Sequence, residues 1–266
     1  MKTLSRLYNV AIFGFLYLPI FLLILFSFNS TQNRVVFEGF SLRWYDDLFH
    51  NSEIMNALGV TISIALISTV ISTIIGTAAA LGIHRMNRKL RNVFMAVNNL
   101  PMVNPEIVTG ISMMLMFAFI YRTVGVLELG YGTLLISHIT FCIPYVLLQV
   151  MPKLRQMNQH MYEAALDLGC PPFKAFFKVV LPEIMPGVAT GALMAFTMSL
   201  DDFVISLFTS GSSAQNLSVS IYSMVKRHVT PEINALSTLM FGTVLILLVA
   251  INVLQIRDEN KNKRRT

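Results

Sequence analysis

The sequence predicts an all-α membrane protein that crosses the bilayer several times. Of its 266 residues, 55% are hydrophobic and only 13% are charged, and the mean hydropathy is +0.64. A soluble domain carries about 25% charged residues. Six apolar runs alternate with polar segments, and most of them are long enough to span hydrocarbon. We therefore expect a six-span transmembrane domain over 10–256, a cytoplasmic N-terminus over 1–9 and a charged, disordered cytoplasmic tail over 257–266.

The first apolar run, about 10–28, is followed by a long polar segment. No small-residue cleavage site follows the run, so we expect a retained helix, kinked at Pro19, rather than a removed signal peptide. The polar segment 29–55 suits an ordered extracytoplasmic element. We expect its Trp44 to lie at the membrane interface, where tryptophan is enriched.

The second and third runs, about 57–83 and 93–121, differ in what they can face. Small residues four apart in the second run permit close helix packing. They are Gly76, Ala80 and the pair Ala78/Gly82. The third run carries too many polar groups and helix breakers to face lipid, so we expect it to face protein or a wet cavity. These residues are Asn98, Asn99, Pro101, Asn104, Pro105 and Glu106.

The remaining runs cover about 137–151, 184–208 and 234–256. Small residues at four-residue steps open the fifth run and indicate another closely packed helix. They are Gly187, Gly191 and Ala195.

The distribution of basic residues predicts that both termini lie inside. With this orientation, about three quarters of the 20 Lys and Arg residues fall on cytoplasmic segments. Such a bias is the usual signature of cytoplasmic loops. The net charge of +6 is explained in this way, and we expect no nucleic-acid partner.

Residues 152–183, between the fourth and fifth runs, predict a helical hairpin in the cytoplasm. Apolar residues recur at three- and four-residue steps up to Leu168, and Gly169 with the prolines after it should end that helix. A second short helix is expected from Phe173. The polar face of this hairpin cannot sit in hydrocarbon, so the hairpin either meets a soluble partner or rests on the lipid surface as an ordinary amphipathic connector.

Part of this hairpin resembles the EAA loop of ABC-importer permeases. The residues that carry the resemblance are Glu163, Ala164, Ala165, Gly169, Leu181 and Pro182. It implies a type I ABC-importer permease fold in which this loop docks into a groove on a separate cytoplasmic ATPase. The sequence has no G-x-x-x-x-G-K-[ST] phosphate loop, which agrees with a non-catalytic subunit. We expect no cofactor on this chain, with ATP and Mg bound by the ATPase.

Four further segments make the resemblance more specific. Residues 137–144, 198–203, 221–226 and 231–236 are similar to the permeases of spermidine/putrescine ABC transporters, and among these to the second permease subunit. The resemblance implies inward transport of polyamines by alternating access in the bacterial inner membrane. It also implies a heterodimer with a homologous permease, two copies of the ATPase and an extracytoplasmic polyamine-binding protein.

Three acidic residues in the apolar runs are candidates for guiding a cation: Glu106, Asp201 and Asp202. A carboxylate at the bilayer centre costs about 2.5–3.5 kcal/mol, so it usually faces a pathway and has a partner. At 1.5 Å per residue, these acids lie roughly 20–26 Å along their spans, in the outer half. Adjacent acids cannot share one helix face, so one aspartate should line the path while the other caps or pairs. Alternatively, one or both aspartates sit at a hydrated helix end, and Glu106 satisfies backbone groups freed by Pro105 or Pro101.

Aromatic residues at similar depths could bind an ammonium group through their ring faces. We include Phe203 and Tyr222 in the candidate pathway, although aromatics in membrane proteins more often serve packing or interface belts. Two other functions stay open. The cargo could be another small solute such as sulfate, molybdate or iron, but the three acids would repel an anion. A secondary transporter would need internal repeats or an acid–histidine relay, and neither is evident.

Overall fold

The protein is built from helices over the part of the chain that the structure describes. The computed structural model describes residues 2–31, 36–227 and 231–263. Five helical stretches there are long and apolar enough to cross a membrane, and α1 (Lys2–Ser27) adds the shorter apolar stretch Ala11–Ser27. The prediction of an all-α polytopic membrane protein is confirmed. The count of six spans and the orientation of the termini stay predictions. The five stretches are α3 (Ser52–Arg85), α5 (Glu106–Val124), α6 (Tyr131–Gln156), the run Pro172–Asp201, and Glu232–Val253 within α12 (Pro231–Lys263).

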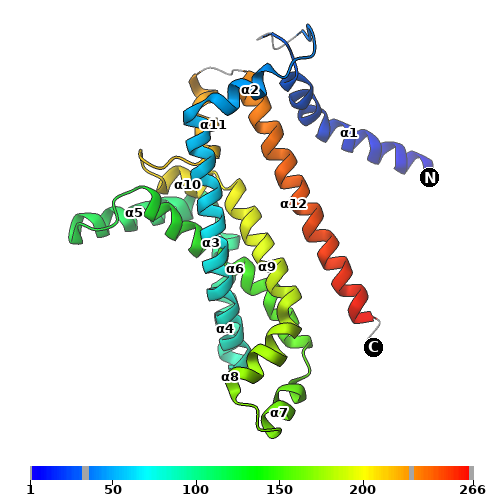
Figure 1. Cartoon of the computed structure of the whole chain (residues 1–266), viewed down its shortest axis with the longest axis vertical. Coiled ribbons are helices and arrows are strands. Elements are labelled where there is room, and N and C mark those ends of the chain that lie inside the picture. Colours follow the sequence, from blue (N-terminus) through cyan, green and yellow to red (C-terminus); the bar gives the residue numbers. More distant parts are fainter. Residues whose placement is uncertain (1, 32–35, 228–230, 264–266) are drawn as a thin grey trace.

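The centre of the molecule is a close bundle of α3, α6 and α9 (Leu181–Asp201), in which glycines allow the helices to approach (Figure 1). A Cβ atom at Gly76 of α3 would lie 2.8 Å from Cβ of Val146 on α6. A Cβ atom at Gly187 of α9 would lie 2.8 Å from the carbonyl oxygen of Gln149. Both distances are shorter than real Cβ contacts, so only glycine fits, and the predicted close packing at these positions is confirmed.

The second predicted pair of small residues behaves differently. Ala78 and Gly82 are exposed, and a Cβ atom at Gly82 would meet nothing within 4 Å. The prediction that this pair mediates packing is therefore wrong within the chain, whereas Ala80 on the neighbouring face is fully buried.

The third apolar run, about 93–121, is interrupted at the helix breakers that its sequence contains. α4 (Arg88–Val103) ends at Asn104, which has extended backbone angles, and α5 begins after Pro105. A residue before proline is pushed out of the helical region, which explains the break. α4 has no buried residue, and α5 leaves the bundle and packs against the short helix α10 (Val204–Thr209) (Figure 1).

One end of the molecule has its own small core, formed by α2 (Arg43–His50), α3, α11 (Leu217–Arg227) and α12. Trp44 of α2 is only 4% exposed, and its Nε1 donates a hydrogen bond of 2.6 Å to the carbonyl oxygen of Asn29. The expectation of an interfacial Trp44 is therefore wrong. The side chain instead packs α2 against α3, α11 and α12.

The termini form the outlying parts of the fold. α1 extends away from the bundle and contacts α12 (Figure 1). α12 continues as a helix to Lys263, so the expected disorder of the tail is wrong for residues 257–263; residues 264–266 lie outside the described part.

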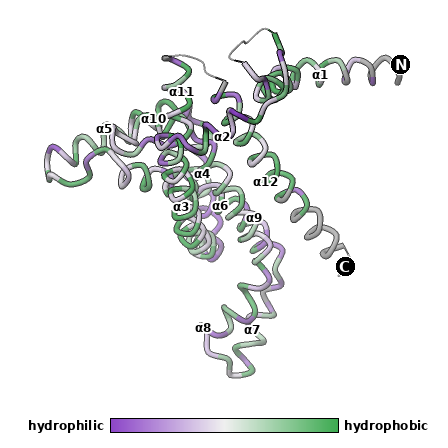
Figure 2. Tube along the Cα trace, turned by 45° about the horizontal axis from the view of Figure 1, so that its top comes forward, coloured by the Kyte–Doolittle hydropathy of each residue, from purple (hydrophilic) through white to green (hydrophobic). Residues whose placement is uncertain are grey.

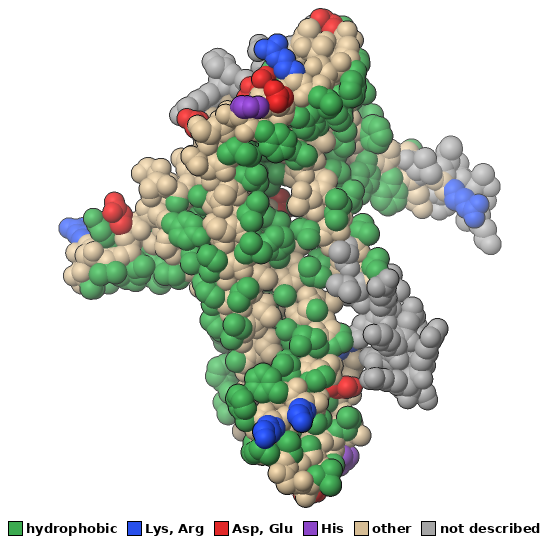
Figure 3. All heavy atoms as spheres, in the orientation of Figure 1, with side chains coloured by type: hydrophobic (Ala, Val, Ile, Leu, Met, Phe, Trp, Pro, Cys, Tyr) green, Lys and Arg blue, Asp and Glu red, His purple; other side chains and the backbone are tan. Residues whose placement is uncertain are grey.

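Hydrophobic and charged side chains are separated along the long axis of the molecule. Hydrophobic residues dominate the long helices in Figure 2. On the face seen in Figure 3, charged side chains lie near the top, near the bottom and at the outlying tips of α5 and α1, and the surface of the central helices between them is mostly apolar. A lipid bilayer would cover the apolar middle and leave both ends in water. The protein is a multi-pass membrane protein.

Candidate functional site

The hairpin between α6 and α9 projects from one end of the molecule (Figure 1). α6 ends at Gln156, and α7 (Gln159–Asp167) begins after Asn158, whose side chain accepts a hydrogen bond of 3.0 Å from the N–H of His160. This bond satisfies one of the free N–H groups at the start of α7. The sequence therefore breaks the helix at Asn158, within the periodic run that was expected to form one helix up to Leu168.

Gly169 ends α7 in the way that its residue type predicts. Its φ of +80° lies in the left-handed region, which side-chain-bearing residues rarely adopt. The N–H of Gly169 bonds to the carbonyl of Leu166 at 2.8 Å, and the N–H of Cys170 bonds to that of Ala165 at 3.1 Å. These two bonds form a Schellman cap, which satisfies carbonyls at the helix end.

The second helix of the hairpin is not separate from the span that follows it. α8 (Pro172–Ala175) passes through a π-helical turn (Phe176–Val180) directly into α9, and the N–H of Leu181 bonds to the carbonyl of Phe176. Pro182 has no N–H to donate, and the wider turn before it keeps the chain helical. The expectation of an independent short helix is therefore wrong. Leu181 is half-buried and Pro182 is exposed.

The tip of the hairpin presents apolar side chains to solvent. Leu168 is 88% exposed and Phe173 is 76% exposed. Glu163 and Ala164 are also exposed, and Glu163 lies 3.2 Å from Nδ1 of His160, whereas Ala165 is half-buried. Leaving large apolar groups in water is unfavourable by roughly 25 cal/mol per Å², so this surface has the properties of a contact site.

A buried polar network lies within the bundle, centred on Asp202. This aspartate follows α9, is 7% exposed, and accepts hydrogen bonds from the N–H and the hydroxyl of Ser206 at 2.8 and 2.7 Å. The N–H of Ile205 contributes a longer bond of 3.4 Å. Asp202 therefore caps α10 from inside the protein.

His138 of α6, 2% exposed, connects this cap to the other helices of the bundle. Its Nδ1 lies 2.7 Å from the hydroxyl of Ser199, and its Nε2 lies 2.9 Å from that of Ser206. Ser199 also reaches Ser68 of α3 at 3.1 Å. Asn216 donates a bond of 2.7 Å to Ser206, so the network joins α3, α6, α9, α10 and the loop before α11.

The five residues predicted for the pathway fall into different environments. Asp202 is buried, while Asp201, the last residue of α9, and Glu106, the first residue of α5, are exposed. Asp202 bonds to the start of α10, as expected of one aspartate of the pair, and the expectation that the other, Asp201, lines the path stays a prediction. The rings of Phe203 and Tyr222 lie together, with centroids 4.9 Å apart.

Two residues of the buried network and of the aromatic pair were not predicted from the sequence. His138 sits within an apolar run, where an ionisable residue is costly and therefore informative; this signal could have found it. Lys226 places its Nζ 4.7 Å from the ring centroid of Tyr222, a contact that the four-residue spacing on one helix could have indicated. Among the described residues, no group of three His, Cys, Asp or Glu is placed to hold a metal ion.

Comparison with known proteins agrees with this arrangement. Residues 72–259 match the family model described as "Binding-protein-dependent transport system inner membrane component". The chain is 39% identical over 254 residues to the putrescine transport system permease protein PotI of Escherichia coli (strain K12), covering 95% of this chain and 90% of the relative. It is 37% identical to the spermidine/putrescine transport system permease protein PotC of the same strain, covering 96% of this chain and 94% of the relative.

Solved structures share the fold at much lower sequence identity. A chain of a bacterial ABC transporter for the import of the acidic polysaccharide alginate superposes with a TM-score of 0.72 at 16% identity, covering 97% of this chain and 95% of that one. The same kind of transporter in complex with an alginate-bound periplasmic protein gives 0.69 at 17% identity, covering 96% and 94%. The resemblance to ABC-importer permeases is confirmed. The chain belongs to the family of inner membrane components of binding-protein-dependent transport systems.

Proposed function

We propose that this chain is one permease subunit of an ABC importer that moves polyamines inward across the bacterial inner membrane. The observation that carries the cargo assignment is the identity of 37–39% to permeases named for putrescine and spermidine, which extends over at least 95% of the chain. The alginate importer shares the fold at only 16% identity, so this similarity is more specific than the fold. A homologous permease as partner and an extracytoplasmic polyamine-binding protein complete the transport path.

Two copies of a separate cytoplasmic ATPase supply the energy in this proposal, one at the hairpin of each permease. The exposed Leu168 and Phe173 beside Glu163 support docking at this tip, because a groove on the ATPase would cover apolar groups that now face water. Ala164 and Gly169 have no bulky side chain and allow close approach. ATP and Mg belong to the ATPase, and this chain contributes no cofactor.

Movement of the docked hairpin has a direct mechanical route into the bundle. The guanidinium of Arg85, at the end of α3, lies 5.7 Å from the ring centroid of Tyr162 on α7. The tight contact of Gly187 with Gln149 couples α9 to α6. α7 also packs against α8 and the π-helical turn that continue into α9, and these contacts support alternating access driven from the hairpin.

Within the membrane, we assign the guiding of the cationic cargo to Glu106 and Asp201. Both carboxylates are exposed on this chain, so they are available to a cavity shared with the partner permease. Asp202 positions α10 and the start of the path from its buried network. Phe203 offers a ring face to an ammonium group of the cargo. The ring of Tyr222 already holds the ammonium of Lys226 at 4.7 Å, so a cargo ammonium would have to compete with Lys226 for it.

The test is ATP-dependent uptake of putrescine by proteoliposomes that contain the full complex. We expect Glu106→Gln and Asp201→Asn each to lower uptake at subsaturating putrescine by about fivefold, because a charge pair at 4 Å in water is worth about 1 kcal/mol. Asp46→Asn, a neutralised exposed acid on α2, is the matched control and should change little.

Each outcome bears on one part of the proposal. Unchanged uptake in both pathway variants would remove the cation-guiding assignment. Uptake of sulfate or molybdate in place of putrescine would replace the cargo, and putrescine uptake without the ATPase would favour a secondary transporter.

A further inference from the structure

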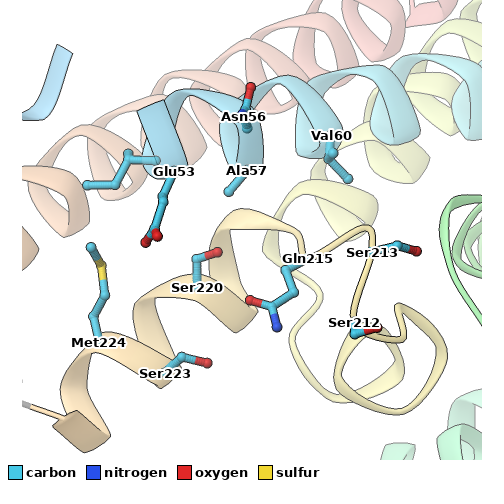
Figure 4. Close-up of a pocket in the computed structure, with 11 residues that line it drawn as sticks. Glu53, Asn56, Ala57, Val60, Ser212, Ser213, Gln215, Ser220, Ser223 and Met224 are labelled. Atoms are coloured by element: carbon cyan, nitrogen blue, oxygen red, sulfur yellow. The ribbon is translucent and has the colours of Figure 1, made fainter. Parts of the chain in front are cut away.

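A pocket of about 380 Å³ opens between α3, α11 and the loop before α11 (Figure 4). Its volume lies at the lower end of the roughly 300–1,000 Å³ of small-molecule sites. It belongs to the end of the molecule opposite the hairpin, as the places of α11 and α7 show in Figure 1. None of the residues predicted for the pathway lines it.

The charge of the pocket comes from a single carboxylate. Glu53, in the first turn of α3, reaches from this helix towards α11 (Figure 4), and the lining contains no Lys, Arg or His. Among the ion pairs of the described residues, none involves Glu53. An unpaired carboxylate in a concave site attracts a cation.

The other polar lining groups are suited to accept hydrogen bonds. The hydroxyl of Ser223 donates its proton to the carbonyl of Val219 at 3.0 Å, which leaves its lone pairs for an incoming donor. Ser220 and the amide of Gln215 face the same space (Figure 4). A primary ammonium carries three N–H donors and no acceptor, so a carboxylate with hydroxyl and amide oxygens matches its requirements.

An anion would find little to bind here, although two helices begin nearby. The side chain of Asn51 already accepts hydrogen bonds from the N–H groups of Glu53 and Ile54. The side chain of Asn216 accepts one from Val219. Since these helix-end N–H groups are occupied, the usual anion site of a helix N-terminus is closed.

Apolar lining side chains complete the match to an alkylamine. Ala57, Val60 and Met224 provide carbon surface next to the polar groups, as methylene units require. We propose that this pocket binds one primary ammonium end of an alkyl diamine or triamine before the amine enters the membrane path. This inference rests on the proposed polyamine function, and it adds an entry site built around Glu53.

The test uses the full complex in nanodiscs, with Cys170→Ser to silence the hairpin thiol and Ser220→Cys as the reporter. Modification rates are measured with a cationic aminoethyl methanethiosulfonate and a neutral methyl methanethiosulfonate. We expect Glu53→Gln to lower the ratio of cationic to neutral rates by about fivefold, the effect of one nearby charge in water. Putrescine should slow modification of the reporter, and Glu53→Gln should raise the half-protecting concentration by about fivefold, the same effect of one charge. Asp46→Asn, at the same end, should change neither value.

The result that overturns the inference is equal protection by putrescine with and without the Glu53 carboxylate, or no protection at all, in a complex that still imports putrescine. Absence of putrescine import by the wild-type complex would instead refute the proposed function. If Glu53→Gln does not assemble, Ser223→Ala tests the same pocket, with an expected rise of about threefold in the half-protecting concentration; an unchanged value there would also overturn the site.

Discussion

The hydroxyl of Ser206 determines the proton arrangement in the buried network of Asp202. This oxygen lies 2.7 Å from the Asp202 carboxylate, 2.7 Å from Nδ2 of Asn216 and 2.9 Å from Nε2 of His138. Its one proton must go to the carboxylate, which only accepts, so the other two groups must donate. Nε2 of His138 therefore carries a proton, and every partner of this hydroxyl is satisfied without an additional group.

Removing that hydroxyl should destabilise the protein more than its size suggests. Ser206→Ala leaves Nε2 of His138 and one lone pair of the Asp202 carboxylate without a hydrogen-bond partner in the bundle core, and each unsatisfied buried group costs about 1–3 kcal/mol. Nδ2 of Asn216 loses one of its two bonds and keeps the one to the carbonyl oxygen of Asp202 at 3.1 Å. We expect the thermal transition of the purified protein in detergent to fall by several degrees. Ser112→Ala is the control, because this exposed hydroxyl bonds only to the carbonyl of Val108 in its own helix. Equal transitions in the two variants would contradict the network.

Gly169 allows backbone geometry and space to be tested separately. A Cβ atom there would meet nothing within 4 Å, so the cost of a side chain comes from its φ of +80°. We expect Gly169→Ala to weaken the Schellman cap by about 1 kcal/mol, and Gly169→Asn to weaken it less because asparagine tolerates left-handed backbone. Hydrogen exchange at the end of α7 should be faster in the alanine variant than in the asparagine variant. The reverse order would show that the cap does not control this helix end.

At the scale of helices, local signals predicted some features and failed where a distant contact decides. Gly169, Gly76 and Gly187 each serve the purpose that their residue type indicates. The burial of Trp44 was not predicted because it depends on its bond to Asn29 and on packing against residues of α11 and α12, which are far away in sequence.

The candidate site was also predictable only in part: local segments were found, and contacts between distant segments were not. The hairpin residues from Glu163 to Gly169 were found because a short, periodic segment contains all of their information. The network around His138 was not found from the sequence, because it joins five segments that only the folded bundle brings together. The break at Asn104 was visible in the sequence as Pro105, because the residue before a proline is disfavoured in a helix.

Two glycines in comparable helices should respond in opposite ways to the same methyl group. Gly187→Ala places a Cβ atom 2.8 Å from a backbone oxygen of α6, whereas Gly242→Ala on α12 meets nothing within 4 Å. We expect the first to lower the thermal transition through a cost of about 1–3 kcal/mol for overpacking. The second should leave the transition unchanged or raise it slightly, since alanine favours helix. A similar fall in both variants would mean that close contact of α9 with α6 is not what Gly187 provides.

On the scale of the whole molecule, several long apolar surfaces have no partner within the described chain. α5 projects from the bundle, and the main contact of α1 is with α12 (Figure 1). Ala78 and Gly82 of α3 are exposed. Lipid can cover all of these surfaces, and a second permease could cover part of them. Lipid cannot cover the charged ends, so they lie in water on the two sides of the membrane. Coupling to a cytoplasmic ATPase requires that the end with the hairpin lies on the cytoplasmic side.

The native Cys170 offers a direct test of that orientation. It lies directly after the hairpin glycine and is partly exposed, whereas Cys142 is buried in the bundle core. If both termini are cytoplasmic, a membrane-impermeant maleimide added to intact cells should leave Cys170 unmodified, and the same reagent added to inverted vesicles should label it. Ser41→Cys, in the segment between α1 and α2, should give the opposite pattern. Labelling of Cys170 in intact cells would place the hairpin outside, where no cytoplasmic ATPase could reach Leu168 and Phe173.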